Sequence, residues 1–186
     1  VGLGPTCLIS VILFIVAQTM LLIGITTPDK FVFDEVHYVP AARQMLEPVM
    51  PQPMLNPMHP PLAKQMIAMS IRAFGDDPLG WRFAGTLFGA LGIVAIYLCG
   101  LALFANQPQA IAAAAIAFCN QMLFVMARTA MLDIFALTLA LFGLAAFLFG
   151  FRRRRPQLCF ALSGLSFGFS AACTLPGFFP PATCLA

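Results

Sequence analysis

The chain has 186 residues, of which 61% are hydrophobic and only 9% are charged, and its formal net charge at pH 7 is +3. So few charged side chains cannot cover the surface of a water-soluble domain of this length, so the composition excludes that class and predicts a membrane protein. The positive charge comes largely from the arginine run at 152–155. A short run between apolar segments indicates membrane topology rather than nucleic-acid binding.

Several apolar stretches are long enough to cross a bilayer, which requires roughly 20 helical residues. We therefore predict an all-α polytopic fold in which residues 1–186 form one unit with about five transmembrane helices. The chain starts at Val1 and no basic residue precedes the first stretch, so we expect a missing N-terminus rather than a signal peptide. The spans are expected near residues 7–26, 84–104, 109–127, 132–150 and 158–175.

The segment 27–83 between the first two spans is predicted to carry two interfacial helices. Apolar residues recur at helical spacing between positions 33 and 46, which favours an amphipathic helix on the membrane surface, and prolines end it. A second helix is expected to start at Pro60-Pro61, because proline suits the first turn of a helix, and to close near Asp76-Asp77-Pro78.

Small and polar residues within the spans predict close contacts between helices. Gly85 with Gly89, and Gly164 with Gly168, form small-xxx-small pairs. Asn120 and the glutamine that follows it are expected to hydrogen-bond to a neighbouring helix. The six cysteines form no CxxC or Cys/His cluster, so we expect buried, unreactive thiols rather than a zinc site or a disulfide framework.

The arginine run at 152–155 also predicts the orientation of the chain. The positive-inside rule places this run in the cytoplasm, and counting spans backwards then places the loop 27–83 outside. The ionisable residues that share this external side are Asp34, Glu35, His59, Lys64, Arg128 and Asp133.

Asp34 and Glu35 lie about eight residues past the apolar end of the first span. A carboxylate that is partly desolvated at a membrane interface can have its pKa raised into the range of a general base. The alternative is that both acids solvate the start of a helix, where the helix dipole favours negative charge. For an isolated Asp-Glu pair, that structural interpretation is the commoner one.

Lys64 and His59 lie at the start of the second loop helix. A cation at a helix start opposes the dipole, so Lys64 is expected either to bind a phosphate together with free backbone amides or to reach lipid headgroups. His59 is expected either to hydrogen-bond a substrate or to satisfy the backbone of the loop.

Arg128 and Asp133 bracket a very short connection between two apolar spans. Ionisable groups in such a place either line an aqueous cavity that binds something charged, or form a salt bridge with each other. Taken together, carboxylates and cations on one side of the bilayer suit a transfer reaction in which a base activates the acceptor and cations stabilise a departing lipid phosphate. No Walker loop is present, so a soluble nucleotide donor is not expected.

Four ordered motifs resemble those of the protein O-mannosyltransferases. That family belongs to the GT-C glycosyltransferases, as do the aminoarabinose transferases of lipid A, and the large loop between the first two spans is similar as well. The motifs are Phe33-Asp34-Glu35-Val36-His37-Tyr38, His59-Pro60-Pro61-Leu62-Ala63-Lys64, Arg82-Phe83-Ala84-Gly85 and Ala127-Arg128-Thr129-Ala130-Met131-Leu132-Asp133.

The resemblance implies a GT-C-type N-terminal half that transfers mannose, with inversion, from a polyprenyl (dolichyl-type) phosphate to Ser or Thr hydroxyls of a protein. The motif carboxylates map on Asp34, the expected base, and on Glu35. The family's arginine maps on Arg128, which is expected to bind the lipid phosphate, with Lys64, His59 and Asp133 as further substrate-binding residues. The bilayer is an expected partner and nucleic acid is not. A divalent metal and a dimer are left open.

The chain departs from the family's pattern near its end. It is much shorter than family members, and it reads Thr174-Leu175-Pro176-Gly177 where the family often has a lysine-tryptophan pair. We therefore expect a fragment or a chain frameshifted after about Cys173. The site is expected to face the periplasm of a bacterial plasma membrane or the lumen of the endoplasmic reticulum. Alternatives are a GT-C transferase of another lipid-linked sugar, a noncatalytic truncated product, or a transporter, although transporters place their charges nearer the bilayer midplane.

Overall fold

The computed structural model describes residues 2–49, 53–152 and 156–174, and all regular structure in these ranges is helical. This confirms the all-α prediction. The helices are α1 (Leu3–Leu22), α2 (Glu35–Gln44), α3 (Leu62–Phe74), α4 (Pro78–Phe104), α5 (Gln107–Phe118), α6 (Gln121–Ala127), α7 (Asp133–Gly150) and α8 (Gln157–Ala171).

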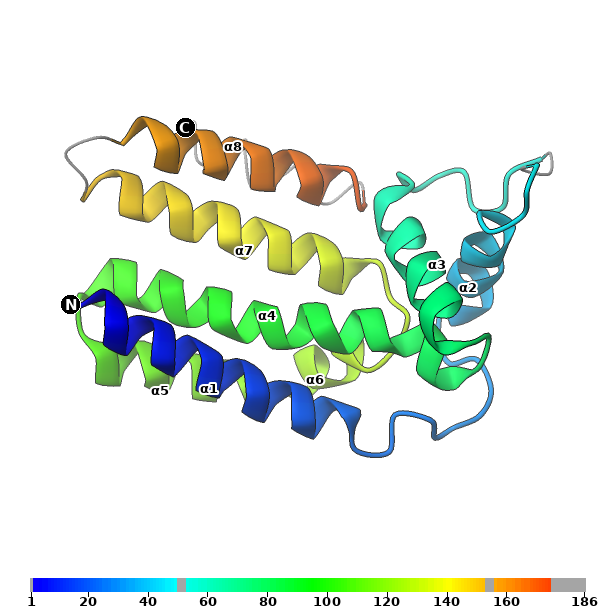
Figure 1. Ribbon diagram of the computed structural model, residues 1–186, viewed down its shortest axis with the longest axis horizontal. Coiled ribbons are helices and arrows are strands. Elements are labelled where there is room, and N and C mark those ends of the chain that lie inside the picture. Colours follow the sequence, from blue (N-terminus) through cyan, green and yellow to red (C-terminus); the bar gives the residue numbers. More distant parts are fainter. Residues whose placement is uncertain (1, 50–52, 153–155, 175–186) are drawn as a thin grey trace.

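Helix α4 is the centre of the bundle. It packs against α1, α3, α5, α6 and α7, and α7 in turn packs against α8. Figure 1 shows α1, α4, α7 and α8 running roughly parallel to the long axis of the molecule, with α2 and α3 gathered at one end. Both loop helices therefore form a cap over that end of the bundle.

In the described ranges, three helices are long and apolar enough to cross a membrane, namely α1, α4 and α7, and the pair α5–α6 makes a fourth if it counts as one span. The prediction of a polytopic membrane protein is thus confirmed. The number of five spans stays a prediction, because length and composition support three or four spans among the described residues. Helix α8 is apolar but has only 15 residues.

The predicted span over 109–127 is not one continuous helix. Helices α5 and α6 are bent by 71° at a break after Phe118. Asn120 accounts for this break, because its Oδ1 accepts the backbone N–H of Leu123 at 3.0 Å and so caps the first turn of α6. A residue that we expected to hydrogen-bond another helix instead starts a new one.

The two predicted loop helices are confirmed as α2 and α3, but their position at a bilayer surface stays a prediction. Pro61 occupies the N-cap of α3, and Gly75 closes the helix with a positive φ of 101° while its N–H bonds to Ile71 O. Asp77 then caps α4 by accepting the N–H of Gly80 at 3.0 Å. These caps turn the chain from the loop directly into the central helix.

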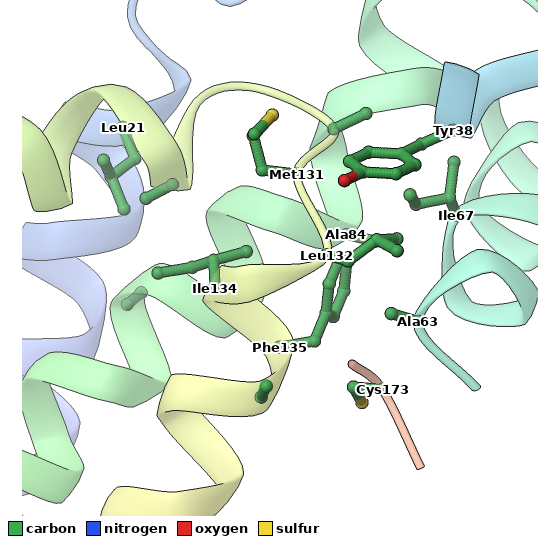
Figure 2. Close-up of a cluster of buried hydrophobic side chains, with 14 of the residues drawn as sticks. Leu21, Tyr38, Ala63, Ile67, Ala84, Met131, Leu132, Ile134, Phe135 and Cys173 are labelled. Atoms are coloured by element: carbon green, nitrogen blue, oxygen red, sulfur yellow. The ribbon is translucent and has the colours of Figure 1, made fainter. Parts of the chain in front are cut away.

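A buried hydrophobic cluster joins the α2–α3 cap to the bundle. Figure 2 shows that Tyr38 and Ile67 from the cap lie beside Met131, Leu132 and side chains of α4 and α7. Because apolar side chains from both parts share one core, the position of the cap on the bundle is set by packing rather than by the connecting loops alone.

Two of the predicted close contacts are present. A Cβ added at Gly85 would lie 2.9 Å from Thr129 O, and one at Gly89 would clash with the Cβ of Ala127. By contrast, a Cβ at Gly164 or Gly168 would meet no described atom within 4 Å. The glycine pair of α4 therefore allows the end of α6 and the connection to α7 to pack closely against α4. The prediction for the pair in α8 is wrong in the described part of the chain.

Hydrogen bonds between helices supplement this packing. Gln18 Nε2 donates to Thr86 Oγ1 at 3.0 Å, linking α1 to α4. Thr138 Oγ1 donates to Phe88 O at 2.8 Å and links α7 to α4. Such contacts stabilise helix association where the hydrophobic effect is absent.

The described cysteines are all free, but the expectation that they are buried holds only in part. Cys99 and Cys173 are buried, Cys159 is half-buried, and Cys7 and Cys119 are exposed on the helix surfaces. The sixth cysteine, at position 184, lies outside the described residues.

The packing predicts that Gly89→Ala lowers the thermal stability, because the new methyl group would overlap Ala127. Overpacking of this kind destabilises by about 1–3 kcal/mol. Gly164→Ala is the matched control, since it changes helix propensity equally but meets no described neighbour. Thermal unfolding in detergent should show a lower Tm for Gly89→Ala only; equal Tm values for the two variants would contradict the close approach.

Candidate active site

Polar residues from distant parts of the chain meet at the end of the bundle that carries the α2–α3 cap. The most direct link is the backbone N–H of Ala130, which donates to Glu35 Oε1 at 2.9 Å although the two residues are 95 positions apart. The loop before α2 and the connection between α6 and α7 are thus held together. The structure therefore brings the Asp-Glu motif and the Arg128–Asp133 region to one place.

Glu35 is completely buried and paired with Arg82. Its Oε1 accepts Arg82 Nε at 2.8 Å and the N–H of Ala130, and its Oε2 accepts Arg82 Nη2 and the N–H of Val32, both at 2.9 Å. A carboxylate offers about four acceptor positions, so none is left for a substrate proton. This geometry favours a structural role for Glu35, one of the two residues expected to be catalytic.

Arg82 also uses every donor that it has. Beyond Glu35, its Nη1 donates to Ile25 O at 3.0 Å and to Pro28 O at 2.8 Å, and its Nη2 donates to Lys30 O at 3.0 Å. Sequence reasoning quoted Arg82 in a motif but did not assign it to the site. The available signal was its position as the charged residue of an otherwise uncharged apolar helix.

Asp34 differs sharply from its neighbour, because it is exposed. Its closest side-chain partner is Tyr38, whose hydroxyl donates to Asp34 Oδ2 over a long 3.5 Å. The pKa of Tyr38 is raised to about 12, chiefly by burial and then by the nearby charges of Asp34 and Asp133. Two carboxylates and a phenol therefore lie close together, and Tyr38 is a second residue that sequence reasoning missed.

Asp34 and Arg128 line adjoining cavities. A cavity of about 630 Å³ contains Asp34, and a smaller one of about 190 Å³ contains Arg82 and Arg128. Phe33 and Val125 line both of these cavities. Asp133 lies at a third cavity of about 490 Å³, which shares three wall residues with the first: Asn120, Met122 and Met126.

Arg128 is half-buried and forms no ion pair with a carboxylate of the described residues. Its guanidinium lies 5.2 Å from the centre of the Phe124 ring, and its Nη1 is 3.5 Å from Met20 O at the end of α1. The ion pairs among the described residues are Arg82–Glu35 and Arg43–Asp76. The alternative of an Arg128–Asp133 salt bridge is therefore not formed, and the guanidinium stays available at its cavity.

Lys64 and His59 lie apart from these three cavities. Lys64 is 1% exposed, and its Nζ donates to Asn56 O at 2.7 Å and His59 O at 2.8 Å, so it orders the loop before α3. Burial lowers the pKa of Lys64. The ring of His59 contacts that of Tyr38 edge-on at 5.9 Å. Both residues contact the site through neighbours rather than facing it.

No group of three or more His, Cys, Asp and Glu side chains in the described ranges could hold a metal ion. Near Tyr38, the site contains two of these metal-binding residue types, Asp34 and Asp133. Among the described residues, the site offers the carboxylates of Asp34 and Asp133, the guanidinium of Arg128 and the buried Arg82–Glu35 pair.

Comparison with known proteins matches residues 58–183 to the family described as "Dolichyl-phosphate-mannose-protein mannosyltransferase". Three bacterial relatives are each named polyprenol-phosphate-mannose–protein mannosyltransferase. The Corynebacterium glutamicum protein is 40% identical over 113 residues, which is 56% of this chain and 22% of that protein. The Mycolicibacterium smegmatis protein is 34% identical over 119 residues, covering 62% and 22%. The Mycobacterium tuberculosis protein is 34% identical over 129 residues, covering 67% and 24%.

The chain thus spans less than a quarter of the length of these relatives. No solved structure matches it. The family match covers more than half of the chain and includes the HPPL motif, Arg82 and the whole Arg128–Asp133 connection. This protein belongs to the dolichyl-phosphate-mannose-protein mannosyltransferase family.

Proposed function

We propose that this chain is the part of a membrane mannosyltransferase that activates the acceptor hydroxyl and receives the lipid phosphate. The reaction moves mannose from a polyprenyl (dolichyl-type) phosphate to a Ser or Thr hydroxyl of a protein. The family and the names of its relatives support this activity. The observation that carries it is the placement of Asp34 and Arg128 on adjoining cavities with two shared walls, Phe33 and Val125.

Asp34 is the proposed general base. It is exposed at its cavity, and its one side-chain hydrogen bond within the described part of the chain, from Tyr38, is long. Its carboxylate can therefore accept the proton of an incoming hydroxyl while that oxygen attacks the anomeric carbon. One base and no covalent sugar–enzyme intermediate give inversion of configuration.

Arg128 is the proposed partner of the donor phosphate. A guanidinium binds phosphate oxygens through directed, charge-assisted hydrogen bonds and stabilises the negative charge that grows as the sugar departs. Asp133, which lines the third cavity, is proposed to contact the acceptor or the sugar. Lys64 and His59 are proposed to act indirectly, by ordering the loop that packs against Tyr38.

The site is proposed to face the external or lumenal side of the membrane. Arg152 donates to Leu103 O near the C-terminal end of α4, whereas Arg82 lies in the first turns of the same helix. Arg152, the first residue of the basic run, and the site are therefore at opposite ends of α4. The positive-inside rule assigns the Arg152 end to the cytoplasm and so the site to the other compartment.

Asp34→Asn tests the base. Removing a general base is expected to lower transfer by about 10²–10⁴-fold, with the protein still folded because Asp34 is exposed. The assay uses membranes containing the protein expressed from its complete reading frame, polyprenyl-phosphate-mannose and a Ser/Thr-rich peptide. Asp76→Asn, which neutralises another exposed carboxylate, is the control. Undiminished transfer by Asp34→Asn would remove Asp34 from this role.

The same assay distinguishes mannosyl transfer to a protein from transfer of another lipid-linked sugar or transfer to another acceptor. If the unaltered protein transfers no mannose but turns over another lipid-linked sugar, the proposed donor is wrong while the base remains testable. Transfer to a lipid or glycan, with none to the peptide, would likewise replace the proposed acceptor.

Arg128→Gln and Lys64→Gln together test which cation binds the phosphate. Arg128→Gln is expected to raise the KM for the donor by about tenfold or more, since a charge-assisted bond contributes roughly 1.5–3 kcal/mol. Lys64→Gln should chiefly lower the Tm, because it leaves two loop carbonyls without their donor, and should change the donor KM by less than about twofold. A donor KM raised by Lys64→Gln and not by Arg128→Gln would reverse the assignment.

A further inference from the structure

Arg82 is a buried residue with an unusually complete set of contacts and no role in the chemistry described above. It is 1% exposed, lies near the start of α4, and donates each of its five N–H groups. Two of these bonds go to Glu35 and three go to backbone carbonyls of one loop. The planar guanidinium is suited to such a fixed fork of donors, which a lysine cannot reproduce.

The contacts of Arg82 and Glu35 join two chain segments. On one side, Arg82 gathers the carbonyls of Ile25, Pro28 and Lys30, which lie in the loop between α1 and α2. On the other side, Glu35 accepts the N–H of Ala130 in the connection between α6 and α7. Arg82 itself lies in the central helix α4. Its bonds therefore hold both segments in place against the most extensively packed helix of the bundle.

These two segments carry the residues of the proposed reaction. Asp34 directly precedes Glu35, and Arg128 precedes Ala130 by two positions. The turn at Ala130 is tight, because the N–H of Met131 bonds back to Thr129 O at 2.8 Å. A shift of either segment would therefore move a reacting side chain.

The backbone around Asp34 also depends on the pair. Phe33 has a φ of +52°, a left-handed conformation that is uncommon for a residue with a large side chain. The turn is closed on both sides, since Val32 N–H donates to Glu35 Oε2 at 2.9 Å and Glu35 N–H donates to Val32 O at 3.1 Å. This turn points Glu35 into the core and leaves Asp34 exposed to the cavity.

We propose that Arg82 is a positioning residue, which through Glu35 sets the distance between Asp34 and Arg128 for mannosyl transfer. This inference rests on the proposed function. Displacing a reacting group by about 1 Å can lower a rate by about 100-fold, even when the change is remote from the chemistry. The residue would therefore affect kcat more than substrate affinity.

The experiment compares Arg82→Lys, Arg82→Met and the double variant Glu35→Leu with Arg82→Met. Each is made in the protein expressed from its complete reading frame, and Tm, kcat and the KM values for donor and peptide are measured. Replacing a buried ion pair by apolar residues commonly recovers the stability lost when one partner is removed. We expect the double variant to have a higher Tm than Arg82→Met, while its kcat stays about 100-fold below that of the unaltered protein.

Asp76→Asn is the matched control. It removes the other ion pair among the described residues, Arg43–Asp76, whose side chains are 38% and 48% exposed. Its kcat should be unchanged. If kcat returns together with Tm in the double variant, Arg82 only stabilises the fold and the proposal is overturned. If the double variant does not accumulate, Arg82→Lys decides: a parental kcat, or a loss equal to the loss of folded protein, overturns the proposal.

A second readout separates this proposal from the mannosyltransferase activity. An Asp34→Cys thiol is labelled with a water-soluble maleimide and followed in the tryptic peptide 31–43, which contains no native cysteine. Adding Arg82→Lys should change the labelling rate by about fivefold or more as the loop opens, whereas adding Asp76→Asn should not. If Arg82→Lys alters the labelling rate but the protein with Asp34 intact transfers no mannose, only the proposed function is overturned. If the labelling rate is unaltered, the positioning role is overturned even when the protein with Asp34 intact is active.

Discussion

The buried ion pair between Arg82 and Glu35 is the contact on which the site end of the molecule depends. Removing two charges from water costs several kcal/mol per ion, and attraction between them offsets this only when the remaining donors and acceptors are also satisfied. Here all five N–H groups of Arg82 and both oxygens of Glu35 are used, at 2.8–3.0 Å. The pair is tolerated because three backbone segments converge on it.

The packing of α4 makes this convergence geometrically accessible. A side chain at Gly85 would approach Thr129 O to 2.9 Å, so only glycine lets the connection after α6 lie so close to the helix. That approach places the N–H of Ala130 within reach of Glu35. Helix packing and the ion pair therefore support each other, and the glycine pair contributes to the site as well as to the bundle.

Sequence patterns predicted the fold well where the signal is local. Apolar length predicted α1, α4 and α7, and the prolines and acids of the loop correctly delimited α2 and α3. The α5–α6 break was missed because Asn120 can either bond across helices or cap a helix, and hydropathy does not distinguish the two. The packing of Gly164 was overestimated, since a small residue permits close contact but requires a neighbour.

The sequence by itself determined the membrane class, the helical composition and the grouping of the ionisable residues at one end of the spans, because hydrophobic length and span parity are properties of the chain order. Only the tertiary structure decided that Asp34 is exposed while Glu35 is buried and paired with Arg82. It also decided that Lys64 bonds to its own loop. Asp34 and Glu35 are both acidic residues with nearly the same hydropathy, so the sequence does not distinguish them. Their difference arises from hydrogen-bond partners up to 95 residues away, and these partners exist only after the helices have packed.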